Sequence, residues 1–463
     1  MSRDALTPLD ATFLELEEAD DAAHMHIGSV MVFEPSNPPT PARLRRHVER
    51  RLGQLPRYRC RLSEPHTAAL HWPSWVPAAE FDIADHVTAE RLAPPGGEDQ
   101  LVEWAGRYWS ERLDRGRPLW HMCLLTGLEG GRWAIASKTH HALVDGVGSV
   151  DVVNLLLDAE RRPPRRRPSP PEAPPEEGSG ALKLLADGLR TGLYTARHPG
   201  RLRDAFLEAK AMGEVLVSDE VIAAPACSLT AEIGGEREYR VIRTDLERLK
   251  EVKRGLGGTV NDAVLAAVTA GLRELLSERG ERLPSPGLRA MVPVNLRTAA
   301  QRFGLGNQVS SLFLHLPVAE PDALRRYRLL ARESAHMKEG RLAAGGADLV
   351  RLSGIAPPIL HSLFARSVFA TRLFNLTVTN VPGPQLPLYA FGARMEEVLP
   401  LVPLAAEHSV GVAVVSYDGR VFFGLVGAGA GAKDLGVLAR GIERGIAELS
   451  RLAPGHEPLP ALR

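Results

Sequence analysis

Residues 118–148, PLWHMCLLTGLEGGRWAIASKTHHALVDGVG, combine two apolar runs with a cluster of histidine, aspartate and glycine. The runs PLWHMCLLTGL and RWAIASKTH are separated by Glu129-Gly130-Gly131, a spacing typical of a β-hairpin. The motif HHALVDG, residues 140–146, directly follows the second run, and VGSVDVVNLLLDAE after it predicts a helix. This stretch therefore predicts a pair of strands that ends in a loop of chemically active side chains.

Strands and helices alternate on both sides of this stretch. Before it, HMHIGSVMVFEP predicts a strand, and PARLRRHVERRLGQL and QLVEWAGRYWSERL predict amphipathic helices. After it, TVNDAVLAAVTAGLRELL predicts a helix capped by Asn261 or Thr259. Further strands are predicted at LRAMVPVNLR, QVSSLFLHLPV, FNLTVTNVPGP, HSVGVAVVSYDGR and VFFGLVGAG. The pattern predicts an α/β protein with a similar mixed texture in both halves.

A proline-rich segment divides the chain. RRPPRRRPSPPEAPPEEGSG, residues 161–180, has too much proline for a helix and too few apolar residues for a core. A chain of 463 residues also exceeds one ordinary core. We therefore expect an N-terminal domain over 1–160, a Pro/Arg-rich linker with connecting helices over 161–215, and a C-terminal domain over 216–463.

The composition excludes several classes of protein. Lys plus Arg and Asp plus Glu number 56 each, which predicts no nucleic-acid partner. The cysteines Cys60, Cys123 and Cys227 are too few and too scattered for a disulfide framework or a zinc site, so no metal is expected. MSRDALTPLD lacks the apolar region of a secretory signal, and no apolar run is long enough to span a membrane. We expect a cytoplasmic protein that meets lipid, if at all, from the surface.

The histidine motif suits proton transfer during attack by a hydroxyl group. A histidine is largely neutral near pH 7, with an ordinary pKa of about 6.5, and can take the hydroxyl proton. In this interpretation Asp145, before Gly146, fixes the geometry of His141 without taking a proton itself. The competing interpretation is a packed or surface pair of histidines, because the HxxxDG spacing also arises by chance. No G-x-S-x-G sequence is present to supply a serine nucleophile.

Five signatures in order give the chain a resemblance to a known family. They are LTPLDATFLELE with HMHIGSVMVFEP, DRGRPLW, KTHHALVDGVG, GGTVNDAVLAAV and TNVPGP. Together they resemble the bacterial wax ester synthase/acyl-CoA:diacylglycerol acyltransferase family, within the wider group that includes chloramphenicol acetyltransferase and condensation domains. PACSLTAEIGG and the arginine-rich linker depart from that pattern, which bears on acceptor choice and membrane contact rather than on the chemistry.

The resemblance implies a fold, a reaction and a set of site residues. The fold is two similar chloramphenicol-acetyltransferase-like domains with the active site in a tunnel between them. The reaction is O-acyl transfer from acyl-CoA, a co-substrate, to diacylglycerol or a long-chain alcohol, without a cofactor and without a covalent acyl-enzyme. The implied catalytic residues are His141 as general base, with His140, Asp145, Gly146 and Asn261. The implied substrate-binding or site-shaping residues are Pro118, Leu119, Trp120, Asp262, Asn380, Pro382 and Gly383.

Several expectations stay open from the sequence. Trp120 and Pro118 equally suit strand packing, and Asn261 equally suits a helix cap. Contact with a membrane or a lipid droplet is possible at the basic linker, while the oligomeric state is undetermined. Two alternative functions are a condensation-type enzyme that acts on carrier-bound acyl groups and a non-catalytic lipid-binding or droplet protein.

Overall fold

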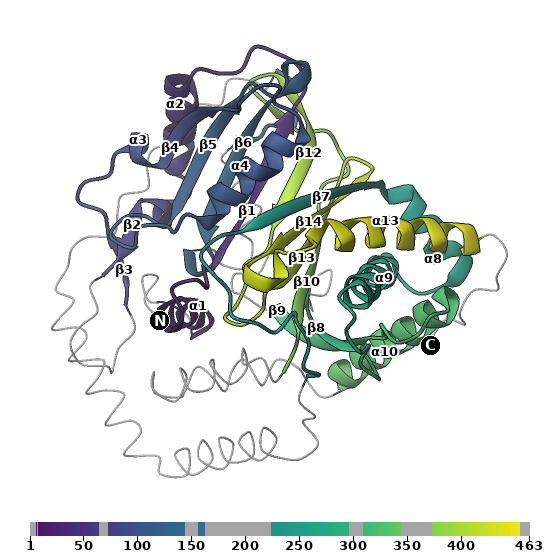
Figure 1. Cartoon of the computed structure of the whole chain (residues 1–463). Coiled ribbons are helices and arrows are strands. Elements are labelled where there is room, and N and C mark those ends of the chain that lie inside the picture. Colours follow the sequence, from purple (N-terminus) through teal and green to yellow (C-terminus); the bar gives the residue numbers. More distant parts are fainter. Residues whose placement is uncertain are drawn as a thin grey trace, which may run out of the picture.

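The computed structural model describes residues 6, 8–63, 73–143, 156–162, 224–295, 309–343 and 373–453. Within these ranges the chain forms two six-stranded sheets and one small two-stranded sheet. The two large sheets lie side by side, each with its own helices (Figure 1).

The first sheet has the order β11-β12-β1-β6-β5-β4. Its strands are β1 (His26–Phe33), β4 (Val87–Arg91), β5 (Trp120–Thr126), β6 (Trp133–His140), β11 (Tyr389–Ala390) and β12 (Ala393–Leu401). Only β4 and β5 pair in parallel, and the other neighbours are antiparallel. The predicted hairpin is present as β5 and β6, joined through η2 (Glu129–Gly131).

The first sheet has three helices beside it, namely α2 (Pro41–Leu52), α3 (Ile83–His86) and α4 (Glu98–Ser110) (Figure 1). Helix α1 (Pro8–Ala19) lies near one end of β1 and contacts η3 (His141–Leu143). A short turn, η1 (Pro56–Arg59), leads into the small sheet of β2 (Cys60–Leu62) and β3 (Trp75–Pro77). The helices predicted at 41–55 and 100–113 are therefore present, each with its apolar residues buried.

The second sheet has the order β7-β14-β13-β10-β8-β9. Its strands are β7 (Glu238–Asp245), β8 (Leu288–Asn295), β9 (Val309–Leu316), β10 (Leu376–Pro382), β13 (Val410–Tyr417) and β14 (Arg420–Gly427). Strand β10 pairs in parallel with both β8 and β13. All five strands predicted in the second half of the chain are present here.

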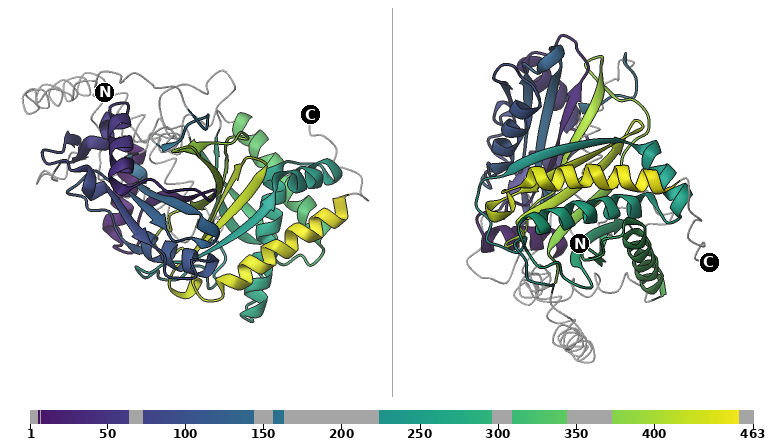
Figure 2. Two further views of the ribbon diagram at one scale, coloured as in Figure 1. Left: turned by 90° about the horizontal axis from the view of Figure 1, so that it is seen from above. Right: turned by 45° about the vertical axis from the view of Figure 1, so that its right-hand side comes forward.

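Four helices cover this sheet on the side away from the first sheet (Figures 1 and 2). They are α8 (Leu246–Leu256), α9 (Val260–Glu278), α10 (Ala323–Ala343) and α13 (Leu435–Leu452), which follows η5 (Gly429–Gly431). Helix α9 begins at Thr259, whose hydroxyl accepts from the Asp262 N–H while the Asp262 carboxylate accepts from the Thr259 N–H. Of the two predicted caps, Thr259 is the one observed.

The two sheets do not follow the predicted division of the chain into 1–160 and 216–463. Strands β11 and β12 come from the predicted C-terminal domain but complete the first sheet, where β12 pairs antiparallel with β1. In this register Val30 lies opposite Leu399, and both are fully buried in the first core. Without β12, the apolar strand β1 would be an open edge, and pairing satisfies its backbone hydrogen bonds. The predicted linker itself lies almost entirely outside the described residues.

Candidate active site

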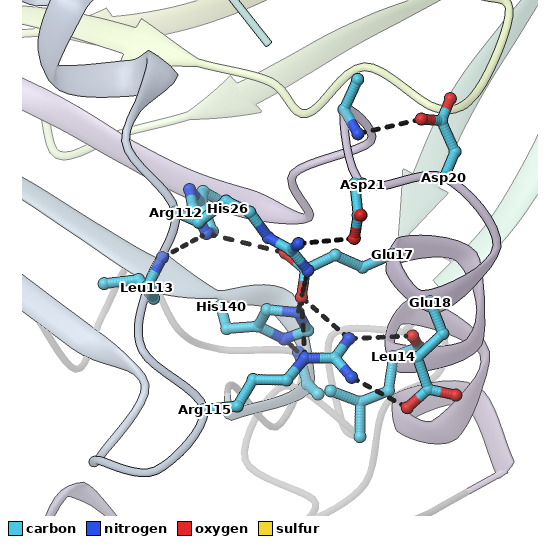
Figure 3. Close-up of polar contacts among 12 residues, drawn as sticks. Leu14, Glu17, Glu18, Asp20, Asp21, His26, Arg112, Leu113, Arg115 and His140 are labelled. Atoms are coloured by element: carbon cyan, nitrogen blue, oxygen red, sulfur yellow. Dashed lines mark hydrogen bonds and ion pairs between the residues drawn. The ribbon is translucent and has the colours of Figure 1, made fainter.

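His140 ends β6, and its ring is held in one orientation. Its backbone N–H donates to the Leu119 carbonyl at 2.9 Å, and its Nδ1 accepts from the Ala142 N–H at 3.1 Å. A neutral imidazole with an accepting Nδ1 carries its proton on Nε2. That Nε2 lies 3.6 Å from Oε2 of Glu17, a carboxylate on α1 (Figure 3). His140 therefore presents an N–H to a buried carboxylate.

His141 follows in the first position of η3 and has different surroundings. Its backbone N–H donates to the Met25 carbonyl at 2.8 Å, and its ring stacks on Phe13 with centroids 3.8 Å apart. The side chain is half-buried, and Nδ1 is buried without a hydrogen-bond partner among the described residues. Burial lowers the pKa of His141 to about 4, and the neighbouring His140 contributes to the decrease. The His141 ring is therefore neutral at pH 7 and able to accept a proton.

Glu17 is the centre of an ionic network that the sequence did not predict (Figure 3). Its side chain is 2% exposed, and Oε2 lies 2.8 Å from Nη2 of Arg115 and 3.5 Å from Nη2 of Arg112. Burial opposes ionisation of Glu17, but contact with His140 and the positive charge of Arg115 hold the pKa of that carboxyl well below its usual range. Glu17 is therefore a carboxylate inside the fold.

Glu17 and Phe13 share one face of α1, because residues four apart on a helix are neighbours. One contacts His140 and the other stacks on His141. The sequence analysis names the segment LTPLDATFLELE only as a family signature. The spacing of Phe13 and Glu17 was visible there, but it does not reveal which face of the helix meets the histidines.

The Pro118-Leu119-Trp120 signature packs in the first core and holds the backbone of His140. All three side chains are buried, and the Trp120 indole donates to the Tyr58 carbonyl at 2.8 Å. The Leu119 carbonyl holds the His140 backbone. These residues pack the first core around β5 in the described structure, and a contact with substrate stays a prediction for them.

A second cluster of predicted residues joins helix α9 to strand β10 of the second sheet. Asn261, in the first turn of α9, accepts a hydrogen bond at Oδ1 from Nδ2 of Asn380 on β10, at 3.1 Å. Both side chains are half-buried. The structure thus joins two residues that the sequence placed in separate signatures. Asp262, predicted as a substrate contact, is buried and uses one carboxylate oxygen to cap α9 at Thr259.

Pro382 and Gly383 lie where the chain crosses from the second sheet to the first. Strand β10 ends at Pro382 in the second sheet, and the chain next enters the first sheet at Tyr389. A Cβ on Gly383 would lie 2.3 Å from the Ser416 carbonyl oxygen, so the close approach of the two backbones requires glycine. Pro382 and Gly383 therefore shape the chain path between the sheets.

Two predicted site residues, Asp145 and Gly146, lie outside the described residues. The features that fix the histidines in the described structure are the Met25 and Leu119 carbonyls, Phe13 and Glu17. Across the residues of known placement, no group of three or more His, Cys, Asp or Glu side chains has the geometry of a metal site. None of the described helices is both long enough and apolar enough to cross a bilayer.

Two mixed sheets, with a His-His loop at the end of a strand in the first, define the two-domain chloramphenicol-acetyltransferase-like fold. Comparisons with solved structures agree. A wax ester synthase/diacylglycerol acyltransferase from Marinobacter aquaeolei superposes with a TM-score of 0.67 at 26% identity, covering 97% of this chain and 100% of that one. The starter condensation domain of rhizomide synthetase superposes with a TM-score of 0.61 at 15% identity, covering 99% and 96% of the two chains, which shows a shared fold alone.

Sequence comparisons give the family. The wax ester synthase/diacylglycerol acyltransferase catalytic domain matches residues 6–264, and the C-terminal domain of the same family matches residues 305–450. A probable diacylglycerol O-acyltransferase of Mycobacterium tuberculosis is 32% identical over 96% of this chain and 95% of its own length. The chain belongs to the wax ester synthase/diacylglycerol acyltransferase family, and it is an acyltransferase.

Proposed function

We propose that the protein transfers a fatty acyl group from acyl-CoA to the free hydroxyl of diacylglycerol, and in second place to that of a long-chain alcohol. The products would be triacylglycerol and a wax ester. The mycobacterial relative is named for diacylglycerol, and the Marinobacter protein is named for both activities. The condensation-domain likeness concerns the fold, and it supports no carrier-bound substrate.

The observation that carries the proposal is the state of His141. Its ring is half-buried, held on one face by Phe13, and neutral because burial lowers its pKa to about 4. Because Nδ1 is the buried nitrogen, we assign the proton transfer to Nε2. A neutral imidazole is suited to take a proton from an alcohol as its oxygen attacks.

The proposed step is direct transfer in a ternary complex. Nε2 of His141 takes the hydroxyl proton while the acceptor oxygen forms a bond to the thioester carbonyl carbon. The resulting tetrahedral oxyanion collapses, the C–S bond breaks, and the imidazolium returns the proton to the CoA thiolate. The scheme involves no acyl-enzyme and no cofactor.

Asn261 is the proposed donor to the oxyanion. Its side-chain oxygen is occupied by Asn380, so its amide N–H groups are the ones that would face the substrate. A donor aimed at a developing oxyanion contributes about 3 kcal/mol to transition-state stabilisation. Asn261 lies in helix α9, which covers the second sheet, and His141 follows strand β6 of the first sheet, so the two residues come from different domains, as the proposed tunnel between the domains requires.

The substrates also imply where the protein works. Diacylglycerol and long-chain alcohols reside in membranes and lipid droplets, so we propose that the protein docks on such a surface from the cytoplasm. The arginine-rich linker is the segment we assign to that contact, through attraction to anionic lipid.

The test is release of CoA thiol from palmitoyl-CoA with dioleoylglycerol or hexadecanol as acceptor. We expect release that depends on the acceptor, and a loss of at least a hundredfold in kcat for His141→Ala, with the melting temperature retained. Mass spectrometry of the wild-type protein during turnover should show no acylated peptide. Full activity in His141→Ala, or an acyl adduct that forms and decays at the rate of turnover, would refute the mechanism.

A further inference from the structure

Arg115 ties the loop before β5 to helix α1 at several points. Its Nε and Nη2 lie 3.0 and 2.8 Å from Oε2 of Glu17, and its Nη2 also donates to the Leu14 carbonyl at 3.0 Å. Its Nη1 donates to Glu18 at 2.8 Å. The guanidinium therefore meets the buried carboxylate with two nitrogens and fixes the helix backbone beside it (Figure 3).

A buried carboxylate is a costly way to anchor a helix. Removing an ion from water costs several kcal/mol, and an apolar pair of the same volume often stabilises a fold equally well. Glu18 is bound by the same Arg115 but is 59% exposed, so it anchors the helix without that cost. Unlike Glu18, Glu17 faces the histidines: its carboxylate lies 3.6 Å from Nε2 of His140 and 3.9 Å from Nε2 of His26.

His140 transmits that contact to the neighbouring histidine. His140 Nε2 lies 3.6 Å from Glu17 Oε2, and on the other side of the ring Nδ1 accepts from the Ala142 N–H and so holds the turn that begins at His141. Phe13, four residues before Glu17 on α1, stacks on the His141 ring. Helix α1 thus contacts both histidines: the Glu17 carboxylate faces His140, and the Phe13 ring stacks on His141.

We propose that Glu17, held in place by Arg115, is a positioning residue that sets the orientation of the His140-His141 pair for acyl transfer. The inference rests on the proposed role of His141 as the base. Arg115 also keeps Glu17 from acting as a competing proton acceptor, because its positive charge stabilises the carboxylate. The pair therefore acts through the histidines and does not touch substrate.

The test compares Glu17→Gln with Glu18→Gln, a matched change on the same helix that also removes a partner of Arg115. We expect Glu17→Gln to lower kcat about 10- to 100-fold with KM for acyl-CoA within about twofold, the range found when the partner of an orienting histidine is removed at metal sites. Glu18→Gln should retain wild-type kcat. A folded Glu17→Gln variant with kcat within threefold of wild type would overturn the proposal.

A second variant covers failure of Glu17→Gln to fold. Glu17→Asp keeps the charge for Arg115 but withdraws the carboxylate from His140 by one methylene. We expect it to fold and to lose kcat at least fivefold, with KM unchanged. Wild-type kcat in Glu17→Asp would show that the carboxylate serves only the ion pair, and would overturn the proposal.

A chemical readout separates this proposal from the proposed function. The rate at which diethyl pyrocarbonate modifies His141, followed by peptide mass spectrometry, needs no turnover. We expect Glu17→Gln to raise that rate at least threefold, because the His141 ring leaves its stack on Phe13, and Glu18→Gln to leave it unchanged. An inactive wild-type protein with this pattern would refute the acyltransfer scheme alone, whereas equal rates in all three proteins would refute the positioning role.

Discussion

Leu399→Ala tests whether a strand from the C-terminal part of the chain holds the N-terminal core together. Leu399 lies on β12, is fully buried in the first core, and faces Val30 across the β1–β12 ladder. A buried leucine-to-alanine change costs about 3–5 kcal/mol, from lost transfer energy and the cavity left behind. With a urea m-value of about 3 kcal/mol/M, the unfolding midpoint should fall by about 1 M.

Tryptophan fluorescence isolates the effect on the first core. All six tryptophans lie between Trp72 and Trp133, so the emission reports on the N-terminal part of the chain. The control is Leu386→Ala, the same change at a side chain that is 72% exposed in the crossover before β11. We expect a midpoint shift of about 1 M for Leu399→Ala and less than about 0.2 M for the control. Equal shifts in the two variants would refute the assignment of β12 to the first core.

Two further predictions concern a tight contact and a buried histidine. Gly424→Ala should destabilise the fold by about 1–3 kcal/mol and lower the melting temperature, because its Cβ would lie 1.9 Å from the Pro400 carbonyl oxygen. The control is Gly235→Ala, whose Cβ would meet open space and should leave the melting temperature unchanged. Equal melting temperatures in the two variants would contradict the packing described. Burial lowers the pKa of His47 to about 4 from 6.5, so the unfolded chain takes up a proton that the folded chain refuses as the pH falls from about 6.5 through 4. Between pH 7 and pH 5 the His47→Gln variant should therefore lose about 2 kcal/mol less stability than the wild type, measured by urea unfolding at each pH. An unchanged pH dependence would show that His47 is not the group responsible.

Hairpins and helix starts were predictable wherever a few consecutive residues encode them. The β5–β6 hairpin follows from two apolar runs around Gly130-Gly131, and the start of α9 follows from Thr259 with Asp262 three residues later. The place of β12 was not predictable. Its pairing with β1 depends on the register and on which strand lacks a partner, and the local sequence of β12 determines neither.

The residues of the candidate site also divide into those with a local sequence signal and those that depend on distant segments. The resemblance implied the histidine pair and the two asparagines from compact motifs, and their roles at the site stay predictions. It did not predict that Asn380 bonds Asn261, or that Glu17 faces His140, because these contacts join distant segments. Glu17 stands among other carboxylates in the sequence (Glu15, Glu18, Asp20 and Asp21). A run of carboxylates is usually solvated, and only the tertiary fold shows that Glu17 is buried.

The late strand β12 also has a consequence for the order of events during synthesis. Strand β1 leaves the ribosome first and β6, which carries His140, follows it, but the second neighbour of β1 emerges only after the chain has been made through Leu401. Until then β1 has one open, apolar edge, which is a template for pairing with other nascent chains. The sheet that contains the histidine strand therefore stays incomplete for most of translation, and the open edge of β1 is the place where we expect a chaperone to bind the nascent chain.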